Sequence, residues 1–489
     1  MNRLMNKEED KKRLNKRIVS LVLLILLVSA STLFAGELAG ELSLEEAIAY
    51  GLENNSGLRT AYEELQRQER NLREAIQLKW QVGLEANYGW NFQQARDLDL
   101  SGADKGDYSV SISAGKNFLS GLTLNPGFNI NENEVTGDIE ASYSFAIRKS
   151  LYPLVPSELA RSYYKSEQDL VKARRSFAGS QLNAVLSWLN TYLNLERMES
   201  RLAIYQENLL KAEANLEKVL ARVEIGDAAK NEILAARLGL ENARYSLQEA
   251  ENNLENLRFD FLNDLGLDPE REIIIRDNNE FLANLRDKVE SQVAQFLALD
   301  REALMEMVEK NNARLEANLL EREILEKELE WLEKEGGPEI GLSSNYNSER
   351  DNLSIGLTLS YSLYDGGRHK LNMENKEKEL RDNLQNYDDI YRQLKQELKK
   401  QLEKLELSRM ALNRAELSLA RSQNELELAE IQLEMGIIDY LEYQDKWIAA
   451  AEARISLKSL EDELFLNNLD FLNLVDQGLL SELIGGIER

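Results

Sequence analysis

GLSSNY, at residues 341–346, resembles GLEANY, at residues 83–88, although 258 positions separate the two segments. A second match lies before each of them, because residues 43–58 resemble residues 299–314 at an offset of 256. Two matches at nearly the same distance are typical of an internal duplication. The sequence therefore predicts two homologous halves within one chain.

The offset between matching segments falls further along the chain. Residues 150–152 match residues 362–364 at an offset of 212, and Gly226 matches Gly436 at an offset of 210. The change from 258 to 212 means that the first half has about 46 additional residues between positions 88 and 150. The segments that follow this region have nearly the same length in both halves.

Strands are predicted in this region of each half. Residues 353–361 and 110–114 alternate apolar with small or polar side chains. A period of two indicates strands with one apolar face, which suits a membrane β-barrel and equally a soluble β-sandwich. We expect the additional residues to form two further strands, at residues 108–116 and 122–130, or one longer hairpin, ordered at the outer end of a barrel.

Aromatic residues gather in the same regions, as they do near lipid head groups. They are Tyr88, Trp90, Phe92, Phe118, Phe128, Tyr143, Phe145, Tyr346, Tyr361 and Tyr364.

Long helices are expected in both halves, because residues 157–268 and 339–489 contain no proline. Leucines in these stretches follow steps of three and four residues, the spacing of a coiled-coil seam. They include Leu182, Leu186, Leu189 and Leu193 in the first half and Leu394, Leu398, Leu402 and Leu405 in the second. Each half is therefore expected to run helix, strands, long helix, glycine turn and returning helix.

The first 35 residues are typical of an export signal. Basic residues precede the apolar run at residues 18–28, which is too short to span a bilayer. Cleavage after Ala30 or Ala35 is expected. Cleavage after Ala35 would remove seven of the 59 basic and three of the 86 acidic residues, which leaves 52 and 83 and a net charge of −31. Such an acidic chain is not expected to bind nucleic acid.

The chain offers little catalytic or metal-binding chemistry. It has no cysteine, and its one histidine, His369, follows the turn-like Asp365-Gly366-Gly367. Acidic residues are interspersed with lysines on predicted helix faces, the pattern of a solvated surface. We therefore predict no enzyme activity, no cofactor and no metal site.

Four segments carry a resemblance to a known family. They are LSLEEAIAYGLENN (42–55), LARVEIGDAAKNEIL (220–234), YSLYDGGRHK (361–370) and LEMGIIDYLEYQ (433–444). In this duplicated order the chain resembles the TolC family of outer-membrane efflux ducts over about residues 42–475. The resemblance implies a mainly α fold with a membrane β-barrel: two tandem repeats of helix, strands and long helical hairpin, with a trimeric α-barrel tunnel continuous with a shared β-barrel.

The function that this resemblance implies is export of small molecules or proteins through a trimeric duct in the outer membrane, with a periplasmic helical tunnel. The implied partners are two further copies of the chain, a periplasmic adaptor, an inner-membrane transporter and outer-membrane lipid. One alternative is a periplasmic coiled-coil adaptor or structural protein without a pore, which should have a single helical hairpin and no duplicated membrane-type strands. A diffusion porin, the other alternative, should be nearly all strand.

The resemblance also gives expected domain boundaries. These are a signal peptide at 1–35; a first repeat at 36–268, with strands at about 82–152 and a hairpin at about 157–265; an equatorial segment at 269–298; and a second repeat at 299–489, with strands at about 339–364 and a hairpin at about 368–470.

The glycine turns of the two hairpins are expected to form the periplasmic entrance. Residues expected to contact the adaptor are Arg222, Gly226, Asp227, Gly436 and Ile437. Glu442 and Asp445, with smaller contributions from Glu232 and Asp439, are expected to form an acidic ring, because three-fold symmetry multiplies each carboxylate at the axis.

Two entrance residues that the resemblance implies are missing from this sequence. Leu433 and Ile438 stand where the family's founding member has a tyrosine and an arginine. The closed entrance is therefore expected to be held by apolar contacts instead of a salt bridge, or to be held less firmly.

Overall fold

The structure, a computed structural model, describes residues 41–76, 80–89, 107–132, 139–270, 274–276, 280–349 and 351–484. The predicted export signal lies outside these residues, as do Trp90 and Phe92. The described residues are mainly helical and carry one large sheet, which confirms the predicted combination of long helices and strands. Among the described helices, none is long and apolar enough to cross a membrane.

Contacts within the chain divide it into two compact units. Among the described residues, the first unit comprises residues 41–56, 184–290 and 408–466, and the second comprises residues 57–183, 291–407 and 467–484. Three long helices contribute to both units: α4 (Glu158–Glu224), α9 (Arg368–Glu434) and α10 (Tyr440–Val475).

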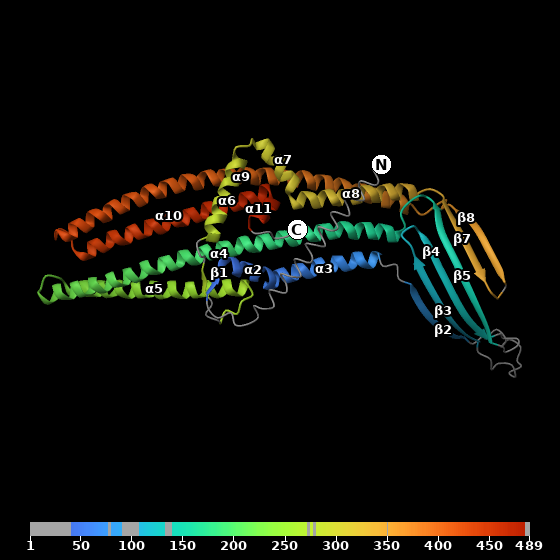
Figure 1. Ribbon diagram of the computed structural model, residues 1–489, viewed down its shortest axis with the longest axis horizontal. Coiled ribbons are helices and arrows are strands. Elements are labelled where there is room, and N and C mark those ends of the chain that lie inside the picture. The colour runs from blue at the N-terminus through green and yellow to red at the C-terminus, as the bar shows by residue number, and fades with distance from the viewer. Residues whose placement is uncertain are drawn as a thin grey trace. The chain divides into compact units, whose positions relative to one another are not determined.

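The second unit contains an antiparallel sheet of six strands in the order β2-β3-β4-β5-β7-β8 (Figure 1). The strands are β2 (Gln81–Gly89), β3 (Asp107–Asn117), β4 (Leu122–Glu132), β5 (Ile139–Tyr152), β7 (Glu339–Asn347) and β8 (Asn352–Ser360). Strands β3 and β4 lie close to the predicted ranges of the additional residues. The first half of the chain therefore contributes four strands and the second half two.

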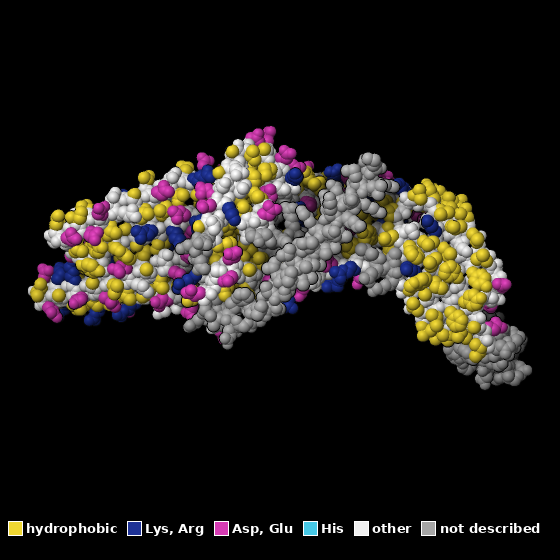
Figure 2. Space-filling view, viewed as in Figure 1, with side chains coloured by type: hydrophobic (Ala, Val, Ile, Leu, Met, Phe, Trp, Pro, Cys, Tyr) yellow, Lys and Arg dark blue, Asp and Glu magenta, His cyan; other side chains and the backbone are white. Residues whose placement is uncertain are grey.

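The register of the sheet gathers apolar side chains on one face. Leu84 is paired with Ile112, Ile112 with Phe128, and Phe128 with Tyr143. The neighbouring row on the opposite face consists of small or polar residues, because Gly83, Ser113, Gly127, Ser144 and Asn347 are paired in the same way. Figure 2 shows hydrophobic side chains gathered over the strands, and many of them are exposed, including Leu84, Ile112 and Ile355.

Helices of the second unit form a row in the order α3-α4-α8-α9. Helix α3 (Ser56–Ile76) packs on α4 through the rings of Tyr62 and Phe177, whose centroids lie 5.6 Å apart. Helix α8 (Ala313–Glu335) contacts α4 through an ion pair of Lys172 with Glu321 at 2.6 Å. Lys376 of α9 pairs with Glu328 of α8 at 2.8 Å. Two short helices complete the unit: α7 (Arg301–Asn311) and α11 (Gln477–Leu483).

The first unit has a compact core around two short parallel strands, β1 (Glu41–Ser43) and β6 (Ile274–Arg276). Helix α2 (Leu44–Asn54) follows β1 and begins with a capping box, in which Ser43 and Glu46 each accept a hydrogen bond from the other's backbone N–H. Strand β6 is followed by α6 (Glu280–Leu297). The buried carboxylate of Asp462 on α10 accepts a 2.5 Å hydrogen bond from Arg286 of α6.

Long helices of the first unit also form a row, in the order α5-α4-α10-α9. Helix α5 (Lys230–Asp264) contacts α4 through Arg258 and Glu199, 3.0 Å apart. Arg197 of α4 donates a 2.9 Å hydrogen bond to Ser459 of α10. Lys446 of α10 pairs with Glu425 of α9 at 3.0 Å. Helices α5 and α9 are thus the two edges of the row.

Both edge helices carry apolar stripes that no part of the described chain covers. On α5 the stripe consists of Leu234, Leu238 and Tyr245, and the side chain of Leu238 is 63% exposed. On α9 it includes Met410 and Leu417, and Leu417 is 74% exposed. Residues spaced in this way lie on one face of a helix, so each edge presents exposed apolar side chains along one face, with polar residues between them.

Gly51 determines how closely α2 packs on the core. A Cβ atom at this position would lie 2.7 Å from Leu265 Cδ2 and 2.8 Å from Trp188 Cη2, closer than real side chains pack. At Gly179 on α4 the same atom would lie 3.5 Å from Gln477 Nε2, an ordinary contact.

We predict opposite effects of alanine at these two helical glycines. Gly51→Ala should destabilise the protein by about 1–3 kcal/mol through overpacking. The matched control Gly179→Ala should be neutral or stabilising by up to about 1 kcal/mol, because alanine favours helix. Thermal unfolding followed by circular dichroism measures both. Equal upward shifts of the two midpoints would contradict the tight packing at Gly51.

Candidate functional site

The two long hairpins end in the same backbone motif, 210 residues apart. At the end of α4, Gly226 N–H donates to Val223 C=O at 3.1 Å, and Asp227 N–H donates to Arg222 C=O at 2.8 Å. This pair of hydrogen bonds is a Schellman motif, which needs a left-handed residue after the helix. Gly226 supplies it with φ +81°.

The second hairpin repeats the motif with different side chains. Gly436 N–H donates to Leu433 C=O at 2.9 Å, and Ile437 N–H donates to Gln432 C=O at 2.8 Å. Gly436 has φ +71°. Apart from the adjoining residues in the chain, no described atom lies within 4 Å of a Cβ built on Gly226 or Gly436, so both turns are open to the surroundings.

The returning helices begin in different ways. Helix α5 follows Ala229, which has no side chain for capping, and Glu232 instead accepts a 3.0 Å hydrogen bond from Ala229 N–H. Helix α10 follows Asp439, whose Oδ1 accepts a 3.0 Å hydrogen bond from Glu442 N–H. Asp439 is therefore a side-chain N-cap, an interaction worth about 1 kcal/mol.

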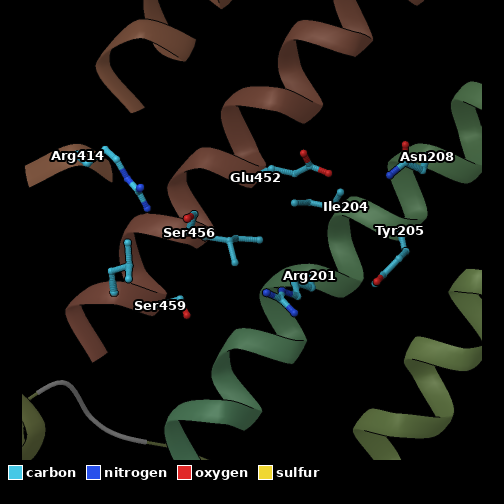
Figure 3. A pocket seen from close by; sticks show the side chains of 10 residues that line it. Arg201, Ile204, Tyr205, Asn208, Arg414, Glu452, Ser456 and Ser459 are labelled. Atoms are coloured by element: carbon cyan, nitrogen blue, oxygen red, sulfur yellow. The ribbon is translucent and has the colours of Figure 1, made fainter. Parts of the chain in front are cut away.

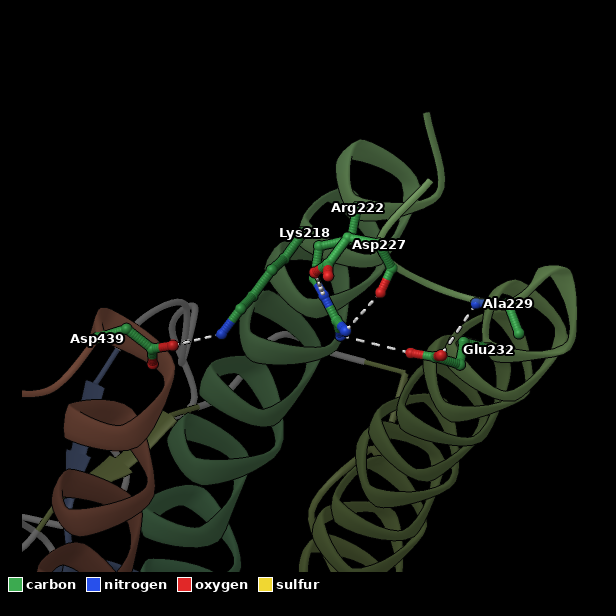
Figure 4. Close-up of polar contacts among 6 residues, drawn as sticks. All are labelled: Lys218, Arg222, Asp227, Ala229, Glu232 and Asp439. Carbon is green, nitrogen blue, oxygen red and sulfur yellow. Dashed lines mark hydrogen bonds and ion pairs between the residues drawn. The ribbon is translucent and has the colours of Figure 1, made fainter. Parts of the chain in front are cut away.

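Arg222 links α4 to the turn and to α5 at the end of the first hairpin, which we call the first tip. Its guanidinium donates to the Asp227 carboxylate at 3.0 Å and lies 3.4 Å from Glu232 (Figure 4). The hydrogen bond and charge of Asp227, followed by the charge of Glu232, raise the pKa of Arg222 above its usual value. Gln432, at the matching position of the second tip, cannot form such ion pairs.

Ion pairs also join the two hairpins to each other. Lys218 of α4 pairs with Oδ2 of Asp439 (Figure 4). Lys211, two helical turns further from the end of the hairpin, pairs with Asp445 of α10. Beside them, Gln444 donates a 2.8 Å hydrogen bond to Glu207 of α4. The hydrogen bond from Lys218, followed by that from Glu442 N–H, lowers the pKa of Asp439.

Three of the four predicted ring acids therefore have a basic partner within the chain. Asp439, Asp445 and Glu232 are paired, whereas Glu442 is exposed and has no basic partner among the described residues. The ion pairs that Lys211 and Lys218 form between the two hairpins were not predicted. A lysine on a helix that also carries many acids gave no sequence signal for this role.

Further from the tips, α4, α9 and α10 enclose a cleft of about 520 Å³ (Figure 3). Its lining includes Arg201, Arg414 and Glu452, together with apolar Ile204 and the hydroxyl of Ser456. Charges of both signs share the cleft with apolar groups, which gives no preference for a particular ligand. None of the predicted site residues lies in it.

Asp439 has two separable roles, and we predict that substitutions distinguish them. Asp439→Asn keeps an N-cap oxygen and loses only the exposed ion pair, so the free energy of unfolding should fall by less than about 1 kcal/mol. Asp439→Ala loses both interactions and should lose about 1 kcal/mol more. Chemical denaturation measures the difference. Equal stability of the Asn and Ala variants would contradict the capping role.

Comparisons with known proteins bear on the fold of the chain. Residues 304–468 match the family model of the outer membrane efflux protein. The Campylobacter jejuni CmeC outer membrane channel has a TM-score of 0.62 at 12% identity, with 91% of this chain and 90% of that chain covered. The outer membrane protein VceC from Vibrio cholerae has a TM-score of 0.60 at 14% identity, with 90% and 96% covered.

A third similar structure is the open state of the Neisseria gonorrhoeae MtrE outer membrane channel, with a TM-score of 0.59 at 13% identity, covering 91% of this chain and 90% of that one. No curated protein sequence matches the chain. The structural likenesses show a shared fold over almost the whole length, and the family match covers residues 304–468. Residues 304–468 therefore match the outer membrane efflux protein family, and the chain as a whole shares the fold of these three channels.

Proposed function

We propose that three copies of this chain assemble into a closed duct that carries cargo across the periplasm and the outer membrane. The proposal rests on one observation. In each unit, the row of helices or strands ends in two edges that no other part of the described chain covers. Helices α5 and α9 end one row of helices, and strands β2 and β8 end the sheet. Each edge has a partner of matching character on a second copy.

The apolar stripes on α5 and α9 supply one contact between copies. Leu238 and Leu417 are large apolar side chains that water surrounds in a single chain. Burying such a side chain contributes about 1.5–3 kcal/mol. Because the two edges are different surfaces, pairing α5 of one copy with α9 of the next is a head-to-tail contact, which closes into a ring when the rotation fits.

The sheet supplies the second contact. In β2 and β8 one side of each backbone is without a neighbouring strand among the described residues. An unpaired backbone is not tolerated in lipid, and the exposed apolar face of the sheet suits lipid contact. The six strands alternate in direction, so β8 of one copy and β2 of the next would be antiparallel, as a closed wall requires.

The hairpin tips are the proposed contact with a periplasmic adaptor, in line with the glycine turns at Gly226 and Gly436. Apolar side chains stand exposed beside both glycines: Ile225 is 80% and Met435 69% exposed. Ile437 is exposed as well, whereas Arg222 and Asp227 add an ion pair at the first tip. Matching apolar groups on two open turns form a repeated docking surface. An inner-membrane transporter would then deliver the cargo.

In the closed entrance, the ion pairs of Lys211 and Lys218 are proposed to hold the second hairpin against the first. Glu442, without a basic partner within the described chain, is the main contributor to the proposed acidic ring. Asp445, Asp439 and Glu232 contribute less while their partners neutralise them. The pKa of Asp439 is lower in the folded than in the unfolded protein. The stability contributed by its ion pair with Lys218 is therefore fully present above the unfolded pKa of about 4, and it is lost as the pH falls through the lowered folded value.

The assembly itself is tested by a charge placed on an edge. Detergent-extracted protein from outer-membrane fractions should sediment as a trimer, and Leu238→Lys should reduce the trimer fraction at least about tenfold, because roughly 1.5 kcal/mol or more of apolar burial is lost. Asn253→Lys, at an exposed position on the flank of the same helix, is the matched control and should leave the trimer unchanged. A monomeric native protein, or one absent from the outer membrane, would refute the proposal.

The acidic ring is tested by ion selectivity in planar bilayers. Glu442→Gln should remove most of the preference for cations and most of the block by divalent cations, and Asp445→Asn should have a smaller effect because Lys211 already faces it. Thermal stability should change by less than about 1 kcal/mol in either variant. If the variant that combines Glu442→Gln with Asp445→Asn kept the ion selectivity of the natural protein, these carboxylates would be ordinary solvated groups.

A further inference from the structure

The two repeats contribute unequal numbers of strands to the sheet. GLEANY lies in β2 and GLSSNY in β7, so these two strands correspond. Residues 150–152 at the end of β5 match residues 362–364 just after β8, so β5 and β8 correspond as the strands that lead into the long helices. The hairpin of β3 and β4 has no counterpart in the second repeat.

This additional hairpin lies within the sheet. Strand β3 is paired with β2 from Gln81↔Gly115 to Gly89↔Asp107, and β4 is paired with β5 from Leu122↔Lys149 to Glu132↔Ile139. In the second repeat the corresponding strands β7 and β8 are paired directly with each other. The hairpin therefore separates two strands that would otherwise be neighbours.

Side chains of the hairpin continue both faces of the sheet. Val110, Ile112, Phe128 and Ile130 extend the apolar face, and their register partners on β2 and β5 are Ala86, Leu84, Tyr143 and Ala141. The other face carries small neutral residues: Ser109, Ser111, Ser113 and Gly115 on β3, and Thr123, Asn125, Gly127 and Asn129 on β4. A loop projecting from a wall has no need of such an alternation, whereas a lipid-facing wall requires it.

We propose that the β3–β4 hairpin is an insertion that widens the outer-membrane pore. The inference rests on the proposed trimer: three six-stranded sheets give an 18-stranded wall, and without the hairpin the wall would have 12 strands. With strands about 4.8 Å apart and tilted by about 40°, the backbone diameter is about 35 Å for 18 strands and about 24 Å for 12.

The widening changes which cargo the outer-membrane part can pass. Side chains narrow a barrel of about 35 Å to roughly 25 Å, about twice the diameter of an α-helix with its side chains. Between residues 109–115 of β3 and 123–129 of β4 this face carries hydroxyl, amide and glycine groups, so this part of the insertion adds width without adding a charge, and Asp107 follows at the end of the same face. The pore of this chain is thereby suited to bulky polar solutes or to a polypeptide segment with secondary structure.

A chimera with equalised repeats tests the inference. In the chimera, residues 90–139 are replaced by the four-residue turn sequence of residues 348–351. Tyr88 then becomes the register partner of Ala141, as Tyr346 is the register partner of Leu353 in the second repeat. End-on images of the detergent-extracted trimer by electron cryomicroscopy measure the ring. The expected diameters are about 35 Å for the natural chain and about 24 Å for the chimera, a reduction of roughly one third. A trimeric natural chain with a ring of about 24 Å would overturn the inference and leave the duct intact.

Cysteine pairs give a second measurement in the natural-length chain, which has no cysteine of its own and needs no chimera to fold. Leu84→Cys with Ile112→Cys should form an intramolecular disulfide, because the two positions are register partners. Leu84→Cys with Phe145→Cys should not, because β3 and β4 separate them. A disulfide in the second pair and none in the first would place the hairpin outside the wall and refute the inference. Loss of the trimer in the natural chain would instead refute the proposed function.

Discussion

Unsatisfied edges are the constraint on which the rest of this structure depends. A row of four long helices exposes apolar stripes at α5 and α9, and a six-stranded sheet leaves one side of the backbone of β2 and of β8 without a neighbouring strand. A single chain can satisfy neither, because its two edges lie at opposite ends of each row. In the proposed trimer, closure through further copies would bury the stripes, complete the hydrogen bonding of the strands and enclose a space at the same time. The proposal thereby gives the stability of the assembly and the duct one origin.

Internal duplication explains how one chain forms such rows. Each repeat supplies a helical hairpin that ends in the same Schellman motif, and Gly226 and Gly436 are interchangeable in conformation. The repeats have diverged in side chains. Arg222 closes the first tip on itself, whereas Gln432 cannot, and Asp439 both caps α10 and pairs with Lys218. The ion pair of Lys218 with Asp439 therefore links the second hairpin to the first. Exposed ion pairs contribute little free energy, so this link is weak enough to break.

Much of the fold could be predicted from local patterns. Alternation at residues 353–361, the proline-free stretches and the repeated glycines indicate strands, long helices and turns, because each of these features depends on neighbours in sequence. The additional strands β3 and β4 could be located by the change in offset between the repeats. Their place between β2 and β5 could not be decided, because the pairing of a strand with its neighbours in a sheet depends on residues far away in the sequence.

The ties between hairpins could not be predicted for a related reason. Lys218 and Asp439 are 221 residues apart, and nothing in either neighbourhood distinguishes them from other exposed charges. Substitution of an expected tyrosine and arginine by Leu433 and Ile438 led to the expectation of an apolar or weaker closure. That expectation stays a prediction, and within the chain lysines of α4 lie opposite carboxylates of α10. Gly51 is a similar case, since only the packing of α2 against Trp188 and Leu265 explains the missing side chain.

Hydrogen exchange of the edge strands tests the central claim most directly. If β2 and β8 are paired with strands of other copies, their backbone amides in detergent-extracted protein should be protected as strongly as those of β4 in the middle of the sheet. Exchange in β2 and β8 that is orders of magnitude faster than in β4, in protein that still carries its full helical content, would show open edges and contradict the account.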